Sequence, residues 1–255
     1  MEGFMEEQFI TLTLDTLEQE HLCCAISDKK HQPGVLQKKA WLRDRIAEGH
    51  VFRKLDTKGK VLIEYAPVET AWVPVAGENY LYIYCLWVAG SYKGKGYGKS
   101  LLLSCIDDAR RQGKSGVCIL SSKKKQPYLS DKRFLMQFGF QVADAAGSYE
   151  LLALRFDETC LPQFTPTVKK LAIDSTDLCI YYSAQCPFTL DCVRQVQGYC
   201  ERHAIPLRLC PVDTLEKAKQ VPCVFQCWAV FYQGVFQTTQ LMNEGLLEKF
   251  LSKLD

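Results

Sequence analysis

The chain has 255 residues, 47% hydrophobic and 24% charged, with a formal net charge of +2. This length predicts two modest domains, and the composition excludes a disordered tail or a fibrous repeat. Because the charge is nearly balanced, there is no overall basic field and nucleic acid is not expected as a partner. The sequence does not fix an oligomeric state.

Thirteen cysteines are the unusual part of the composition: five precede Asp157 and eight follow it. Residues 1–10 are acidic and lack the apolar core of a signal peptide, which predicts a cytoplasmic protein with reduced thiols. The longest apolar run, at 80–89, is about half of a membrane span, so no membrane partner is expected. An odd count leaves at least one thiol outside any disulfide in a monomer.

Apolar periodicity in the first part of the chain predicts mixed α/β structure. We expect strands at 8–14, 51–55, 60–65, 80–88, 117–120 and 148–156, and helices between 34 and 49, at 99–112 and at 131–138. Prolines and a loss of periodicity then indicate a linker at 158–177. The domain boundaries that we expect are therefore 1–157, a linker at 158–177, and 178–255.

Apolar periodicity in the second part of the chain also predicts α/β structure, with fewer elements. We expect strands at 178–183, 206–210, 225–232 and 235–239, and helices at 189–203, 215–220 and 246–254. The predicted order is β-α-β-α-β-β-α, which describes a smaller α/β domain.

The most informative segment is a glycine turn between the strand at 80–88 and the helix that follows it. Its sequence after Leu86-Trp87-Val88 includes Lys93-Gly94-Lys95-Gly96-Tyr97-Gly98-Lys99. Glycines let backbone N–H groups converge without Cβ obstruction, and the start of a helix attracts an anion. Three lysines add positive charge. The segment therefore predicts a site for a phosphate-bearing ligand, and a pyrophosphate in particular.

This segment shares features with three kinds of phosphate loop. A dinucleotide fingerprint requires G-x-G-x-x-G, whereas the glycines here stand at 94, 96 and 98. A Walker loop requires glycine at position 93, which is Lys93. The segment resembles motif A of the GNAT superfamily of N-acetyltransferases, and 134–140 resembles the end of that family's motif B. The resemblance covers 8–156 and implies the GNAT mixed sheet flanked by helices.

The resemblance also implies acetyl-CoA as co-substrate and an amine as acetyl acceptor. The strand end at 86–88 would offer backbone groups to the pantetheine arm, and the amides of 94–98 would hold the pyrophosphate. The implied cofactor-binding residues are Leu86, Trp87, Val88, Lys93, Gly94, Lys95, Gly96, Tyr97, Gly98 and Lys99.

Acetyl transfer needs a neutral amine, and an alkylamine is almost entirely protonated at pH 7. Glu64 is the first candidate for the base, because a carboxylate inside the apolar run 61–66 is functional, paired or on a solvated face. Glu69 and Glu78 are weaker candidates near loops. The family often carries a tyrosine acid four residues before the motif B glycine, where this chain has Leu135.

Other tyrosines could replace that acid, although the CoA thiol leaves with little help. Tyr84, on the same strand face as Leu86 and Val88, and Tyr128 are the substitutes, with Tyr82 a further possibility. The candidate catalytic residues are thus Glu64, Tyr84 and Tyr128. The run 123–125 of three lysines is expected to be a solvated loop, with contact to the cofactor's phosphates as the alternative. The four histidines, His21, His31, His50 and His203, show no partner spacing.

In the second part, Cys186-Pro187-Phe188-Thr189 lies between a strand and a helix. A thiolate there gains from the helix dipole, so Cys186 is the candidate reactive thiol. The placement resembles the nucleophile of a thioredoxin-like fold, and Val221-Pro222 resembles its cis-proline segment. Thr189 replaces the second cysteine of C-x-x-C, and a disulfide to Cys192 would require unwinding of the helix.

An acetyltransferase followed by this module is similar to the YoaP family of bacterial acetyltransferases, which implies a substrate-binding or delivery role for the second domain. A structural module with buried thiols is the alternative. No metal site is expected, because the pair at 223 and 227 has no second ligand pair.

These patterns together predict an N-acetyltransferase that moves an acetyl group from acetyl-CoA to a primary amine of an unidentified small molecule or peptide through a direct ternary complex. The alternative is a CoA-binding, thioredoxin-like interaction or redox module with a degenerate transferase site.

Overall fold

The computed structural model describes residues 9–22 and 31–253. The chain divides into two compact units. Of the described residues, the first unit contains 9–22, 42–71 and 75–163, and the second contains 31–41, 72–74 and 164–253. Helix α1 (Gln32–Ala47) therefore contributes its first residues to the second unit. The sequence interpretation did not group this segment with the C-terminal part.

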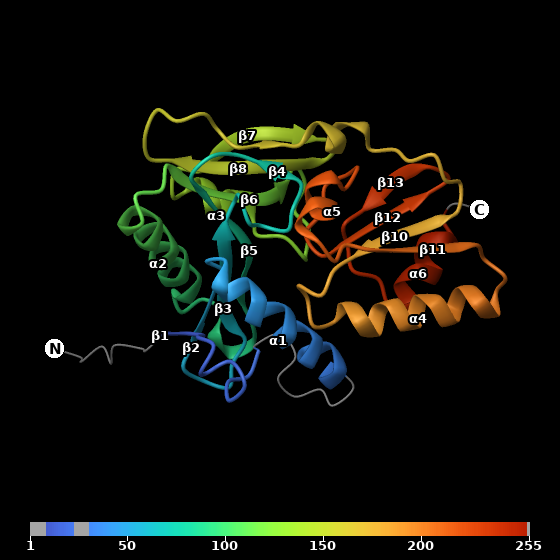
Figure 1. Ribbon diagram of the computed structural model, residues 1–255, viewed down its shortest axis with the longest axis horizontal. Coiled ribbons are helices and arrows are strands. Elements are labelled where there is room, and N and C mark those ends of the chain that lie inside the picture. The colour runs from blue at the N-terminus through green and yellow to red at the C-terminus, as the bar shows by residue number, and fades with distance from the viewer. Residues whose placement is uncertain (1–8, 23–30, 254–255) are drawn as a thin grey trace. The chain divides into compact units, whose positions relative to one another are not determined.

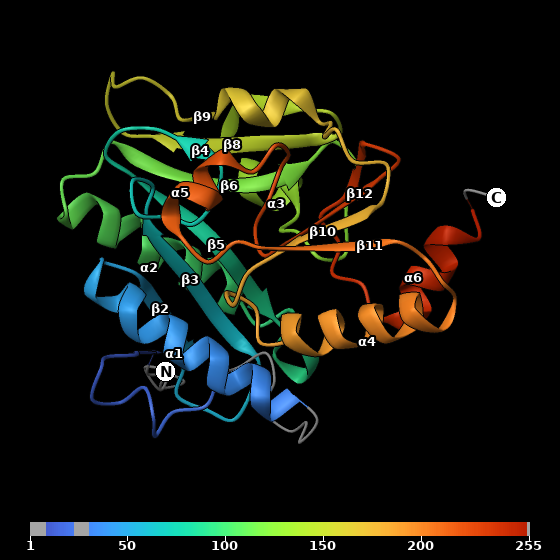
Figure 2. The ribbon, with the colours of Figure 1, turned by 45° about the vertical axis from the view of Figure 1, so that its right-hand side comes forward.

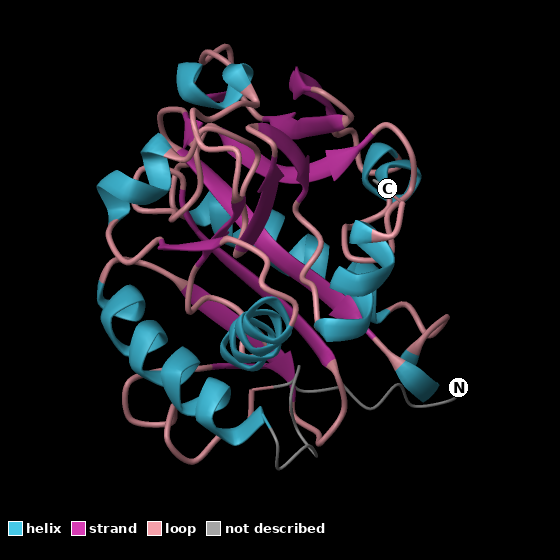
Figure 3. Cartoon of the chain, turned by 90° about the vertical axis from the view of Figure 1, so that its right-hand side faces the viewer, coloured by secondary structure: helices cyan, strands magenta, loops and turns pink. Residues whose placement is uncertain are grey.

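The first unit is built on a mixed seven-stranded sheet in the order β1-β2-β3-β5-β6-β8-β7. Its strands are β1 (Phe9–Thr11), β2 (Val51–Leu55), β3 (Val61–Pro67), β5 (Tyr80–Val88), β6 (Gly116–Ser122), β7 (Gln141–Ala146) and β8 (Tyr149–Arg155). Neighbouring strands are antiparallel, apart from the parallel pair β5 and β6. The helices α2 (Tyr97–Arg111) and α3 (Lys132–Met136) and the end of α1 also belong to this unit. Figure 3 distinguishes helices from strands by colour.

The core of the first unit follows from its apolar patterns. Strands β3 and β6 are buried along almost their whole length, which explains why their sequences are nearly continuous apolar runs. Helix α2 packs one face against the sheet, and that face includes the predicted residues Leu102, Cys105, Ile106 and Ala109. The Tyr65 hydroxyl donates to Asp108 Oδ2 over 2.7 Å and ties β3 to α2.

The second unit contains a four-stranded sheet in the order β11-β10-β12-β13. Its elements are β10 (Leu178–Tyr182), α4 (Thr189–Arg202), β11 (Leu207–Pro211), α5 (Leu215–Gln220), β12 (Trp228–Tyr232), β13 (Val235–Thr238) and α6 (Glu244–Leu251). Strands β10 and β11 are parallel, and the other two pairs are antiparallel. Figure 2 shows α4 and α6 on the same side of this sheet, where both contribute to one hydrophobic core.

The predicted mixed α/β class and the order of the main elements are confirmed. Strand β7 was not predicted, because its sequence mixes polar and small residues without clear alternation. Two short strands, β4 (Val75–Ala76) and β9 (Gln163–Phe164), pair with each other, and short 3-10 turns occupy Gly90–Tyr92 and Pro166–Lys170. Across the described ranges, every helix is too short or too polar to cross a bilayer.

Candidate active site

Strands β5 and β6 of the first unit separate part of the way along. Their parallel pairing runs from Tyr80 opposite Gly116 to Ile83 opposite Ile119, while β5 continues to Val88 beside β3. Figure 1 labels both strands in the first unit. Beyond Ile83, the β6-facing edge of β5 has no pairing with β6 in the described sheet. The predicted residues at 86–88 lie on this part of β5, so their backbone groups can bind an extended ligand.

The glycine turn that follows β5 leaves the start of α2 open. Gly94 and Gly96 have φ of +77° and +85°, in the left-handed region that favours glycine. A Cβ at either position would meet nothing within 4 Å. Gly96 is the N-cap of α2, and within the described chain no side chain accepts a hydrogen bond at this cap. The backbone N–H groups of the first turn of α2 can therefore bind an anion.

The charge and anchoring of this turn come from its side chains. Lys93, Lys95 and Lys99 are exposed. The Tyr92 hydroxyl lies 2.9 Å from Thr57 Oγ1, and a Cβ at Gly59 would lie 2.2 Å from the Tyr92 ring. These contacts hold the turn against the β2–β3 hairpin. The sequence interpretation missed Tyr92, because its partners lie about thirty residues earlier, a long-range contact that periodicity does not report.

Glu64 is buried and paired. Its Oε1 lies 2.9 Å from His50 Nε2, and both side chains are 2% exposed. Strand pairing explains the contact, because Phe52 lies opposite Glu64 and His50 stands at the start of the same hairpin. The β3–β5 register shifts between Glu64 and Tyr65. Sequence reasoning assigned no role to His50, and only the hairpin register could have linked it to Glu64.

Tyr84 joins this pair. Its ring centroid lies 5.1 Å from that of His50 and 5.3 Å from that of Tyr82. Tyr84 follows Ile83 directly, so the cluster of Glu64, His50 and Tyr84 lies where β5 leaves β6. We call this cluster the Glu64 cluster.

The structure places the other candidates elsewhere. The Tyr128 hydroxyl lies 3.1 Å from that of Tyr149. Leu135 is fully buried in the core, Glu78 is exposed, and Glu69 accepts a hydrogen bond from the Asn79 N–H over 2.6 Å.

Two lysines of the run 123–125 are engaged within their own loop region. Lys123 Nζ donates to the Gly147 carbonyl over 2.9 Å, and Lys125 pairs with Asp131 over 2.8 Å. Asp131 also accepts a hydrogen bond from the Arg133 N–H as the N-cap of α3. The Lys125 hydrogen bond and this backbone hydrogen bond lower the pKa of Asp131.

In the second unit, Cys186 follows β10 and precedes α4, as predicted. It is partly exposed, and its carbonyl accepts a hydrogen bond from the Thr189 N–H over 3.1 Å. The expected cis-proline segment at Val221-Pro222 is wrong, because the described peptide bonds are all trans. Val221 has φ of −53° and ψ of 127°, an extended conformation that a trans bond to proline favours.

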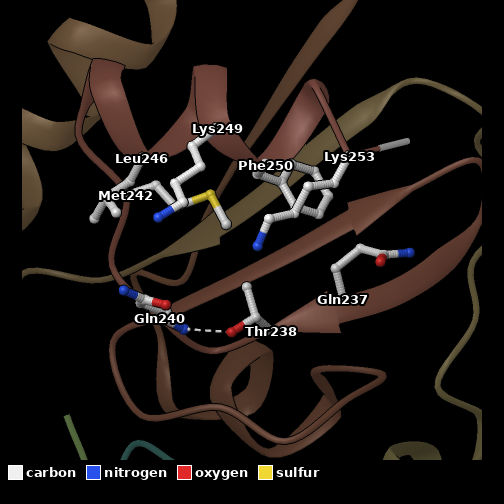
Figure 4. Close-up of a pocket in the computed structure, with 8 residues that line it drawn as sticks. All are labelled: Gln237, Thr238, Gln240, Met242, Leu246, Lys249, Phe250 and Lys253. Carbon is white, nitrogen blue, oxygen red and sulfur yellow. Dashed lines mark hydrogen bonds between the residues drawn. The ribbon is translucent and has the colours of Figure 1, made fainter. Parts of the chain in front are cut away.

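The second unit carries two surface pockets. One, of about 330 Å³, is lined by Gln237, Thr238, Gln240, Met242, Leu246, Lys249, Phe250 and Lys253. Lys249 lies on α6 and Lys253 just after its end, and both side chains point toward the side of the pocket that holds Thr238 and Gln240 (Figure 4). The other, of about 280 Å³, includes His31, Phe188, Asp191 and Cys192. Among the described side chains, no three potential ligands converge as a metal site requires.

Comparison with known proteins gives two family matches. The model of the acetyltransferase (GNAT) family matches residues 14–140, and a YoaP-like model matches 206–249. The uncharacterized N-acetyltransferase YoaP of Bacillus subtilis (strain 168) is 39% identical over 248 residues, which cover 96% of this chain and 99% of the relative.

Solved structures of acetyltransferases align with about three fifths of the chain. The PaiA N-acetyltransferase of Thermoplasma acidophilum, in complex with coenzyme A, is 15% identical with a TM-score of 0.40, over 58% of this chain and 99% of that one. A GNAT family acetyltransferase of Brucella melitensis, in complex with acetyl-CoA, is 15% identical with a TM-score of 0.37, over 62% and 94%. Sequence identity to the B. subtilis relative along nearly the whole chain, together with the GNAT match, shows that this protein belongs to the GNAT family of N-acetyltransferases and carries a YoaP-like segment at its C-terminal end.

Proposed function

We propose that this enzyme transfers the acetyl group of acetyl-CoA to a primary amine of a small molecule or peptide, within a direct ternary complex. The observation that carries the proposal is the divergence of β5 from β6 beside the open start of α2. The alternative of a degenerate transferase is not favoured, because the GNAT match and the whole-length relative both indicate a transferase.

The proposed acetyl-CoA site uses backbone groups first. The free edge of β5 at 86–88 hydrogen-bonds the pantetheine arm, and the N–H groups of 94–98 hold the pyrophosphate. The exposed lysines at 93, 95 and 99 add favourable charge. Tyr97 is buried and orients the first turn of α2 instead of contacting solvent.

The proposed chemistry is centred on the Glu64 cluster. As the amine nitrogen attacks the thioester carbonyl carbon, the Glu64–His50 pair accepts the amine proton. The carbon–sulfur bond then breaks, and the CoA sulfur leaves with the bonding electrons. Tyr84 is the proposed donor of a proton to that sulfur, because it contacts His50, and Tyr128 is the second candidate.

We further propose that, along the sequence, 1–157 is the acetyltransferase domain, 158–177 the linker and 178–255 a thioredoxin-like domain, with which 31–41 and 72–74 form one compact unit. The support is its strand order, in which β10 lies between the parallel β11 and the antiparallel β12. A cytoplasmic location with reduced thiols agrees with the cysteines of the described ranges, which are all thiols.

Kinetics with a panel of amines and peptides tests the function. We expect CoA release that needs both substrates, acetylation of the amine nitrogen, and no acetyl-enzyme when the protein is incubated with acetyl-CoA alone. A stable mass increase of one acetyl group on the enzyme, with a burst of CoA before amine is added, would contradict direct transfer. Failure of every amine to accept an acetyl group would contradict the proposed function itself.

A further inference from the structure

Two cysteines that are far apart in sequence meet in the second unit. Strands β10 and β12 pair with Tyr182 opposite Trp228, and the next pair is fixed by a hydrogen bond from the Ser183 N–H to the Cys227 carbonyl, 3.0 Å long. The turn after β10 then carries Cys186 back toward this end of β12. The side chains of Cys186 and Cys227 are joined by a hydrogen bond.

A buried lysine and the start of α4 lie close to the two cysteines. Lys38 of α1 is 2% exposed, and its ammonium donates to the carbonyl of Gln185, the residue before Cys186. Its charge also lowers the pKa of Cys227, but by less than the hydrogen bond with Cys186 and burial raise it. A cation beside a sulfur stabilises the thiolate, and the start of α4 adds the helix dipole. The hydroxyls of Ser183 and Thr189 are buried and have no hydrogen-bond partner among the described residues, so each has an unused donor near this turn.

The two thiols have different properties. Burial and the hydrogen bond with Cys186 raise the pKa of the Cys227 thiol well above its ordinary value, the hydrogen bond being the larger cause. Cys227 therefore keeps its proton and donates it toward the Cys186 sulfur. This division fits an attacking thiolate at Cys186 and a resolving thiol at Cys227.

We propose that Cys186 and Cys227 form a second reactive centre, which exchanges with low-molecular-weight disulfides and closes into a reversible intramolecular disulfide. A small disulfide is the partner because Cys186 and Cys227 are only partly exposed as residues, so a protein disulfide would have poor access. The proposal is independent of acetyl transfer, since all its residues belong to the second unit.

The exchange is balanced in two steps. The Cys186 thiolate attacks one sulfur of the small disulfide, a mixed disulfide forms, and one small thiolate leaves and is protonated. Cys227 then loses its proton and attacks the Cys186 sulfur, which forms the Cys186–Cys227 bond and releases the second small thiol. Two protein thiols are oxidised, and one small disulfide is reduced to two thiols.

Other cysteine pairs are less suitable. Cys192 lies inside α4 and is 6% exposed, and Cys179 and Cys223 are fully buried. Burial raises the pKa of the Cys223 thiol well above its ordinary value, which makes it a poor attacking group. Cys160 is exposed, and its rate of reaction with the small disulfide provides an internal reference for an accessible thiol.

The test treats the full-length reduced protein with 2-hydroxyethyl disulfide, alkylates the remaining thiols and digests with trypsin. Trypsin cleaves after lysine and arginine, which gives peptides 171–194 and 220–249 that carry Cys186 and Cys227 respectively. We expect these peptides to be cross-linked, with fragmentation placing the bond between Cys186 and Cys227, and two small thiols released per bond.

Three variants complete the test. Cys227→Ser should keep one mixed adduct on Cys186 and lose the cross-link, whereas Cys186→Ser should lose both. Cys192→Ser is the matched control and should retain the cross-link, and thermal melts check that each variant is folded. A wild-type protein that stops at the mixed disulfide with one thiol released, or a cross-link that maps to another cysteine, would overturn the proposal whether or not the variants fold.

Discussion

The two units use the same local arrangement for different chemistry. In the first, β5 leads through a glycine turn into α2, and in the second, β10 leads through Cys186 into α4. In the part of the chain that the structure describes, neither helix start has a side-chain cap. A Cβ at Gly94 or Gly96 would meet nothing within 4 Å, so the glycine turn before α2 is open. In contrast, a Cβ at Gly34 of α1 would lie 1.9 Å from the carbonyl oxygen of Pro187, the residue after Cys186. The turn before α4 is therefore closely packed.

This contrast shows that the groups around the N-terminus of a helix determine which kind of ligand can bind there. Open space, glycines with positive φ and exposed lysines suit a large anion. Close packing, a buried lysine and a second thiol suit a small reactive group.

The largest effect is expected from Glu64→Gln. Removing the proton acceptor beside His50 should lower kcat by about a hundredfold and alter the pH profile, while acetyl-CoA binding and disulfide exchange at Cys186 stay as they are. Steady-state kinetics across pH is the measurement. Glu78→Gln, at an exposed glutamate, is the control and should behave as the wild type. An unchanged kcat and pH profile for Glu64→Gln would remove the Glu64 cluster from the mechanism.

A second change addresses the packed turn. Gly34→Ala places a methyl group against the Pro187 carbonyl, and overpacking of this kind should lower the free energy of unfolding by about 1–3 kcal/mol. Denaturant titration measures it. Gly198→Ala in α4 is the matched control, because the added Cβ would meet only the flexible end of the Arg202 side chain. This variant should raise the free energy of unfolding by up to about 0.8 kcal/mol, since alanine favours a helix more than glycine does. Equal stability of the two variants would show that the second turn is not closely packed.

A smaller effect is expected where the open turn is anchored. Tyr92→Phe removes the hydroxyl that contacts Thr57 and keeps the ring over Gly59. Loss of this hydrogen bond should weaken acetyl-CoA binding by about 0.5–1.5 kcal/mol, because the turn becomes less well ordered. Calorimetry checks this, with Thr57→Val as the partner variant that should show the same loss. If Tyr92→Phe weakens binding and Thr57→Val does not, the hydroxyl contact is not the cause.

The smallest effect on stability is expected at the N-terminus of α3, which has a side-chain cap. Asp131 caps α3 and pairs with Lys125, and both contacts lower its pKa when the protein is folded. The folded pKa lies below the unfolded one, so the stabilisation is present above the unfolded pKa, about 3.9, and is lost as the pH falls through the folded value.

Asp131→Asn keeps the cap and removes the charge, so at pH 7 it should lower the free energy of unfolding by about 0.5 kcal/mol or less. The difference from the wild type should become smaller as the pH falls below about 3.9. Unfolding titrations from pH 7 down to acidic pH measure it, and Lys125→Met, which removes the partner charge, should show the same trend. A difference that does not depend on pH would show that packing, not the charge, is responsible.

Much of the fold and of the anion site could be predicted, because both depend on local patterns. Apolar periodicity located the central strands and the buried face of α2, and glycine spacing located the turn at 94–98. The Glu64–His50 and Cys186–Cys227 contacts could not be predicted, because they depend on strand register and on a turn that joins distant segments. The assignment of 31–41 to the second unit has the same cause, since no local pattern reports which unit a helix will join.

The central claim is that the open start of α2 holds the pyrophosphate of acetyl-CoA. Gly98 tests it directly, because an added Cβ would meet only Phe134 and Val88, at 3.8 and 3.9 Å, without a steric conflict. The measurement is calorimetry of acetyl-CoA binding to Gly98→Ala and Gly98→Asp. We predict that the alanine variant binds acetyl-CoA and that the aspartate variant, with a carboxylate at the anion site, shows no detectable binding. Wild-type affinity in Gly98→Asp would contradict the account.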